Sequence, residues 1–205
     1  MRRLREAFEG WSLTGLLSLT ISLMAFAIAA AHQFDVDGVR AVIRATARTS
    51  LVLFCLAFSA TAVHAFWPSG WTRWQRRNRR YLGVAFAASH AVHALAILSL
   101  SLVAPPLFRA AVTPPMLIFG GIGYAFILLM VATSFDRTAR MLGPRAWRAL
   151  HLTGATYLWL AFLNGFLSRV GADPLYWLPV ALLIAIMSLR IARWYVARRV
   201  GAGMA

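Results

Sequence analysis

The chain has 205 residues, of which 60% are apolar and 13% charged, and is more hydrophobic than an ordinary soluble domain. Its net charge is +15, because 21 arginines and no lysine are balanced by only six acidic residues. Such a charge is also typical of nucleic-acid-binding proteins, but here the arginines lie in short clusters between long apolar runs, as at the flanks of membrane helices.

Six apolar runs are long enough to cross the hydrocarbon core, since one crossing takes about 20 residues as a helix. They are residues 11–31, 49–67, 81–103, 116–135, 149–167 and 174–195. The first run lacks a clean cleavage site and is expected to be retained as a helix. Turn-forming residues such as Gly70 and Pro174 separate the runs. The predicted fold is an all-α bundle of about six transmembrane helices, forming one domain over residues 1–205.

Arginine placement predicts the orientation of this bundle. Arginine-dense segments alternate along the chain with poorer ones, and dense segments are expected in the cytoplasm. The dense segments carry Arg2, Arg3 and Arg5; Arg73, Arg76, Arg77, Arg79 and Arg80; Arg137, Arg140, Arg145 and Arg148; and Arg193, Arg198 and Arg199. Both termini are therefore expected in the cytoplasm and the protein in the inner (plasma) membrane. Residues 36–48 carry three arginines on the other side and are predicted to form a short interfacial helix.

Few polar residues lie inside the predicted spans, and an ionisable residue there is a functional candidate by default. These residues are His64, His90, His93, His151 and Asn164. Imidazole is the usual axial ligand of b-type haem in a helical bundle, and the alternative role is a hydrogen bond to a neighbouring helix. The single cysteine, Cys55, excludes an internal disulfide and is expected to be a buried apolar residue.

Depth along the helices limits how these histidines can pair. At about 1.5 Å per residue, His90 lies near mid-membrane and His93 about 18 Å from the inner end, whereas His64 and His151 lie within one turn of the inner face. His93 and His151 therefore make a poor pair for one haem, and His64 with His151 is the possible inner pair.

Arginines at the inner helix ends offer a second set of candidate contacts. Arg79, Arg80 and Arg148 stand where helices begin, so they could pair with haem propionates or simply anchor the cytoplasmic face.

Three short blocks resemble a known family. Residues 77–83 (RNRRYLG), with His93 ten residues later, resemble the third helix of ferric-reductase-like transmembrane domains. Residues 133–134 (TS), 140–143 (RMLG) and 147–151 (WRALH) resemble that family's approach to its fifth helix, and residues 48–51 its second-helix start. The best match is the YedZ-type haem-binding membrane subunit of the methionine sulfoxide reductase system, over roughly residues 48–170.

This resemblance implies a six-helix cytochrome with one or two b haems. Such a protein carries electrons from a cytoplasmic flavin or quinol donor to a periplasmic acceptor, as the electron-transfer subunit of an oxidoreductase system. A cytoplasmic flavin reductase and a periplasmic reductase are the implied partners, with flavin or quinone as a further cofactor and no nucleic acid. His93 and His151 match the family's ligands, with His64 and His90 as replacements. Asn164 departs from the pattern, since the family has a histidine there.

Two other functions stay open. A divergent, haem-free structural or assembly subunit is favoured by Asn164, because an amide is a poor ligand for haem iron. A small-solute transporter is disfavoured, because no span is broken by proline or glycine at mid-membrane.

Overall fold

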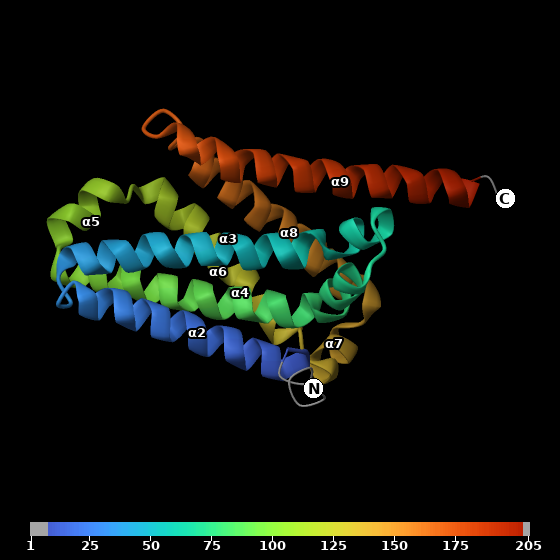
Figure 1. Cartoon of the computed structure of the whole chain (residues 1–205), viewed down its shortest axis with the longest axis horizontal. Helices are drawn as coiled ribbons and strands as arrows, with labels where there is room; N and C mark the ends of the chain where they lie inside the picture. The colour runs from blue at the N-terminus through green and yellow to red at the C-terminus, as the bar shows by residue number, and fades with distance from the viewer. Residues whose placement is uncertain (1–7, 203–205) are drawn as a thin grey trace.

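The computed structural model describes residues 8–202, which form helices and no strand. The elements are α2 (Gly10–Ala31), α3 (Val36–Phe66), α4 (Gly70–Val103), α5 (Pro105–Ala111), α6 (Pro114–Ala132), α7 (Asp136–Leu142), α8 (Pro144–Leu167), the 3-10 helix η1 (Pro174–Tyr176) and α9 (Trp177–Ala202). Figure 1 shows α5 at the left of the bundle and α7 toward its right, where α2 begins and α9 ends. These are called the α5 end and the α7 end below. Arg2, Arg3 and Arg5 lie outside the described residues.

Five helical segments are long and apolar enough to cross a membrane, which confirms an all-helical, multi-pass membrane protein. They are Gly10–Ala31, Val36–Phe66, Gly70–Val103, Pro114–Ala132 and Pro174–Arg199. Helix α8 has 24 residues but is not among the five. Its histidine, its asparagine and its glycines reduce its hydropathy, so the sixth crossing stays a prediction.

Two predicted boundaries are wrong, and in both cases helix replaces a connection. Residues 36–48 are not a separate interfacial helix, because they continue without a break into α3. The Asp35 side chain caps this helix by accepting a hydrogen bond from the Gly38 amide at 2.7 Å. Residues 70–80, expected as a loop, form the first turns of α4 behind a capping box between Ser69 and Thr72.

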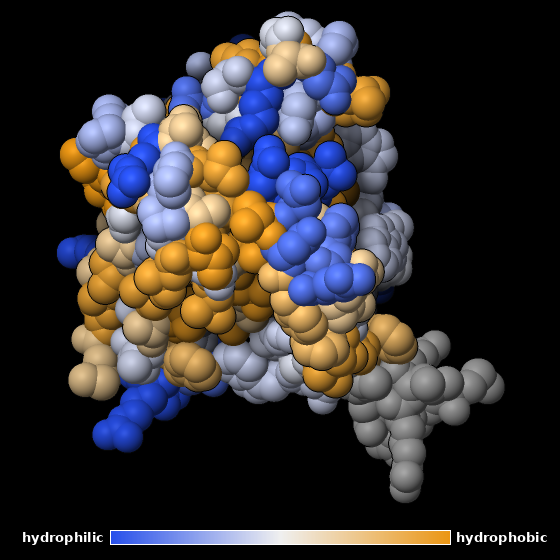
Figure 2. All heavy atoms as spheres, turned by 90° about the vertical axis from the view of Figure 1, so that its left-hand side faces the viewer, coloured by the Kyte–Doolittle hydropathy of each residue, from blue (hydrophilic) through white to orange (hydrophobic). Residues whose placement is uncertain are grey.

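The extra turns make α3 and α4 unusually long. With 31 and 34 residues, they extend about 46 and 51 Å, well beyond a hydrocarbon core of about 30 Å. Both ends of this hairpin therefore reach past the core. Figure 2, which looks at the α5 end, shows hydrophilic residues gathered over part of that face. Exposed polar residues there include His32, Gln33, Asp35, Asp37 and Arg40.

The core is centred on α3, which packs closely against α4 and is flanked by α2 and α9. Serine side chains let α3 and α4 approach: the Ser50 hydroxyl donates to the Ser89 hydroxyl at 2.9 Å, and both residues are fully buried. Cys55 is buried in the same core, as expected. Helix α8 lies between α6 and α9 and contributes only Gly154 and Leu158 as buried residues.

Candidate functional site

His93 faces α3 from the α5-end half of α4. Its Nδ1 lies 3.1 Å from the Ile43 carbonyl oxygen and 3.0 Å from the Thr46 hydroxyl. The Thr46 hydroxyl lies 2.7 Å from the Val42 carbonyl, to which it donates. Since a carbonyl only accepts, the hydrogen is assigned to Nδ1, and the lone pair is left on Nε2. A backbone carbonyl on Nδ1 is the usual arrangement behind a histidine that binds metal through Nε2.

His90 lies one turn earlier on α4 and is surrounded by aromatic rings. Its ring stacks on that of His93 with centroids 5.3 Å apart and lies 5.1–6.0 Å from the rings of Phe86, Tyr124 and Phe162. We call Phe54, Phe86, His90, Tyr124 and Phe162 the aromatic cluster. The Nδ1 of His90 is buried and has no hydrogen-bond partner among the described residues. An unsatisfied buried polar atom costs about 1–3 kcal/mol, so this position calls for an explanation.

His151 is held at the α7 end by Thr133, the residue that follows α6. Its Nε2 lies 3.0 Å from the Thr133 hydroxyl, which in turn donates to the Leu129 carbonyl at 2.7 Å. The ring also stacks on Trp147 with centroids 4.2 Å apart. The Thr133 hydroxyl donates its one hydrogen to the Leu129 carbonyl, so towards His151 it can only accept. Nε2 of His151 is therefore assigned the proton, and the lone pair is on Nδ1.

His64 lies at the corner between α3 and α4. Its Nδ1 lies 3.0 Å from the hydroxyl of Thr72. That hydroxyl donates its hydrogen to the Trp67 carbonyl at 2.9 Å. His64 therefore contacts the start of α4, whereas His151 contacts the end of α6. None of the hydrogen bonds or ring contacts of the described residues joins these two histidines.

His93 and His151 lie toward opposite ends of the bundle. On α4, His93 follows Arg80 by 13 residues, or about 20 Å along the axis, and Arg80 contacts Asp136 at the start of α7. The structure thus agrees with the sequence-based depths: the two imidazoles do not face each other across one iron. Asn164 is exposed, on the outside of α8.

Two of the three arginines named as candidate propionate contacts, Arg80 and Arg148, bond to other groups at the α7 end. The Arg80 guanidinium donates to the Asp136 carboxylate at 2.6 Å and lies 5.5 Å from the Trp11 ring centroid. The Arg148 Nε donates to the Pro144 carbonyl of its own helix at 3.0 Å. Both side chains therefore hydrogen-bond to protein groups in this arrangement.

One residue in a span was missed by the sequence reasoning. Arg190 lies within α9, donates from Nη1 to the Phe58 carbonyl at 2.6 Å and lies 3.9 Å from the Phe58 ring centroid. The signal was present, since a charged residue within an apolar run is a functional candidate on its own.

Two buried amides on α4 were missed as well. Gln75 donates to the Leu56 carbonyl at 2.9 Å, and Asn78 accepts from the Gly10 amide at 2.9 Å. They lie in the segment that the sequence reasoning took for a loop, so they were not considered as parts of a helix.

Metal binding by several side chains finds no support within residues 8–202. No group of three or more histidine, cysteine, aspartate or glutamate side chains is placed to hold a metal ion there. A haem iron is a different case, because the porphyrin supplies four of its ligands and the protein only one or two.

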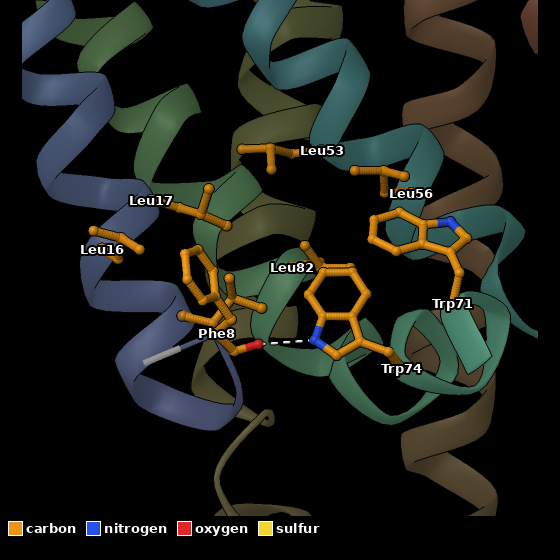
Figure 3. Close-up of a pocket in the computed structure, with 9 residues that line it drawn as sticks. Phe8, Leu16, Leu17, Leu53, Leu56, Trp71, Trp74 and Leu82 are labelled. Atoms are coloured by element: carbon orange, nitrogen blue, oxygen red, sulfur yellow. Dashed lines mark hydrogen bonds between the residues drawn. The ribbon is translucent and has the colours of Figure 1, made fainter. Parts of the chain in front are cut away.

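An apolar groove of about 440 Å³ opens between α2, α3 and α4 near the α7 end. Figure 3 shows Trp71 and Trp74 on one side of it and Leu16, Leu17 and Phe8 on the other. The Trp74 indole N–H donates a hydrogen bond to the Phe8 carbonyl at 2.8 Å. The groove therefore suits a hydrocarbon chain and lacks the convergent polar groups that orient a quinone or flavin ring.

Comparisons with known protein families, with characterised proteins and with solved structures find no match to this chain.

Proposed function

We propose that this chain is a b-type haem membrane subunit that carries electrons from a cytoplasmic flavin or quinol donor to a periplasmic acceptor. The observation that supports it is the pair His90 and His93 on α4. His93 presents an unprotonated Nε2 backed by the Ile43 carbonyl, and His90 beside it has a buried nitrogen that no group within residues 8–202 satisfies.

Among the described residues, His93 is the one whose hydrogen bonding supports a role as a ligand of haem iron. His93 would supply that ligand, and a bound haem would supply reversible one-electron exchange. His151 is too far along the bundle to be the second ligand, and Asn164 is exposed. His90 lies three residues from His93 on the same helix, so it cannot reach the opposite face of one porphyrin. We therefore propose that the iron is bound by one histidine alone or by one histidine and a different kind of ligand, and not by two imidazoles from α4 and α8.

The proposal also includes an orientation. The α7 end holds Arg79, Arg80, Arg148 and Arg193, so it is assigned to the cytoplasm by the positive-inside rule. With α8 as a sixth crossing, both termini lie on that side. A cytoplasmic flavin reductase and a periplasmic reductase are the partners that this orientation would connect.

The test is an absorption spectrum of the purified protein, reduced minus oxidised. A b-type difference spectrum is expected, and His93→Ala should lose most of the haem measured by the pyridine haemochrome assay. Asn164→Ala and His32→Ala are matched controls, because both residues are exposed and should leave haem content unchanged. Wild-type haem content retained in His93→Ala would reject His93 as the ligand.

A haem-free structural or assembly subunit is the second candidate. Hydrogen bonds favour it, because the rings of His64, His93 and His151 each contact a threonine hydroxyl of a neighbouring segment. The aromatic cluster favours it as well, since Phe54, Phe86 and Phe162 fill the space between α3, α4 and α8 with ring centroids 5.2–6.1 Å apart. Folded, monodisperse protein that is colourless and gives no haemochrome would select this function.

A further inference from the structure

Within residues 8–202, one guanidinium lies against α3 with no carboxylate paired to it. Arg190 of α9 is half-buried, and its only hydrogen bond among the described residues is to the Phe58 carbonyl. The guanidinium has five N–H donors, so most of its hydrogen-bonding capacity is left over. A carbonyl and a ring face stabilise the cation but do not neutralise it.

A second guanidinium approaches the same face of α3. Arg79 of α4 donates to the Thr61 hydroxyl at 3.0 Å, and Thr61 is one turn after Phe58. Residues three apart on a helix are neighbours, so Arg79 of α4 and Arg190 of α9 contact neighbouring residues of α3. Arg193 follows Arg190 by three residues on α9, so a third guanidinium lies one turn further along the same helix.

The acidic residues within the described part of the chain pair with other arginines or cap helices. Glu9 pairs with Arg77, Asp37 with Arg40 and Asp136 with Arg80. Asp35 caps α3 and Asp173 caps η1. Within residues 8–202, no carboxylate therefore neutralises Arg79, Arg190 and Arg193, and an anion from outside this part of the chain is the simplest counter-charge.

The depth of these arginines in the membrane indicates which kind of anion they bind. Arg79 is adjacent in sequence to Arg80, whose guanidinium lies over the Trp11 ring, and tryptophan is typical of the membrane–water interface. Apolar residues of α9 on either side, Ile184 and Ile191, are each 49% exposed and so face hydrocarbon in a bilayer. A ligand that combines a phosphate with acyl chains matches both surfaces.

We infer that Arg190 and Arg79 form a binding site for the phosphate of an anionic phospholipid headgroup at the α7 end. Arginine forks fit phosphate oxygens in a bidentate manner, and such charge-assisted hydrogen bonds are the strong ones. The site is independent of the haem proposal, because it uses neither His90 nor His93.

Native mass spectrometry of the delipidated full chain tests this site. With equal phosphatidylglycerol and phosphatidylcholine added, the wild type should retain phosphatidylglycerol preferentially. Arg190→Gln should weaken that binding about tenfold, the effect of losing one charge-assisted hydrogen bond. Arg198→Gln is the matched control, because Arg198 is also on α9 but its guanidinium lies over the Trp194 ring, 4.0 Å from the centroid.

Arg79→Gln keeps the test valid if Arg190→Gln does not fold, because Arg79 is exposed and its substitution leaves no cavity. It should weaken phosphatidylglycerol binding several-fold. Equal retention of the two lipids by the wild type overturns the proposal, as does unchanged binding in both folded glutamine variants. Inorganic phosphate that raises the unfolding temperature as much as phosphatidylglycerol does would identify a solute-anion site and overturn the lipid assignment.

Discussion

Two regions of the bundle are packed very differently. The hairpin of α3 and α4 with α2 has many buried residues, including twelve on α3, whereas α6 and α8 bury two each. The first region, the α2–α4 unit, is also joined by buried polar contacts such as Ser50 to Ser89. We infer that the α2–α4 unit is the stable part of the protein, and that α6 and α8 depend on it and on lipid.

The largest expected effect is at the closest approach of α3 and α4. Ser89→Leu should lower the free energy of unfolding by about 3 kcal/mol, because it overpacks a fully buried site and removes the Ser50 hydrogen bond. Thermal unfolding in detergent measures it. Ser99→Leu, at an exposed position on the same helix, should have almost no effect; equal losses in both variants would contradict the packing difference along α4.

A smaller loss is expected where α2 joins α4. Asn78→Leu should cost about 2 kcal/mol, since it leaves the Gly10 amide without its acceptor and removes the bond to the Trp74 carbonyl. Asn164→Leu is the matched control on the exposed side of α8 and should keep the wild-type unfolding temperature. If Asn78→Leu also kept it, the α2–α4 unit would not depend on this contact.

Helix α8 provides the next test. A Cβ at Gly154 would lie 2.6 Å from the Met130 sulfur and 3.1 Å from a Phe126 ring carbon, whereas at Gly120 it would meet nothing within 4 Å. Gly154→Ala should therefore be about 1 kcal/mol less stable than Gly120→Ala, which shares the gain in helix propensity. The cost is modest because the methionine side chain can move. Identical unfolding temperatures would mean that α6 and α8 do not pack as described.

The smallest effect is expected from the ion pair at the α7 end. Asp136→Asn removes the partner of Arg80, but the Asp136 side chain is 74% exposed, so the expected loss is below about 1 kcal/mol. The loss should shrink further at high salt. A loss of several kcal/mol that salt does not change would show that this pair is a structural link between α4 and α7.

Hydropathy predicted the helices but not where they end. Apolar length identifies a crossing, and residues 49–67 and 81–103 were found because their composition is lipid-compatible. The helical turns before them carry arginines, so this criterion left them out of the spans: residues 36–48 were predicted as a separate interfacial helix and residues 70–80 as a loop. Local capping signals were present at Asp35 and Ser69, where α3 and α4 begin, yet only backbone hydrogen bonding shows that each helix then continues without a break into the apolar run.

The candidate site was predictable in its residues more than in its contacts. Histidines in apolar runs were identified from sequence, and the separation of His93 and His151 followed from helix rise alone. The partners Thr46, Thr72 and Thr133 could not be predicted, because they depend on how helices rotate about their axes. Arg190 was overlooked because one charge barely changes the average over an apolar run.

The single cysteine of the chain has a practical consequence. Cys55 is only 6% exposed, so a maleimide reagent should leave the native protein almost unmodified. Trp67, at the corner beyond α3, and Val103, at the far end of α4, are 60% and 61% exposed. A cysteine introduced at one or the other would report the side of the bilayer directly: a reagent that cannot cross lipid labels one position in intact cells and the other only after lysis.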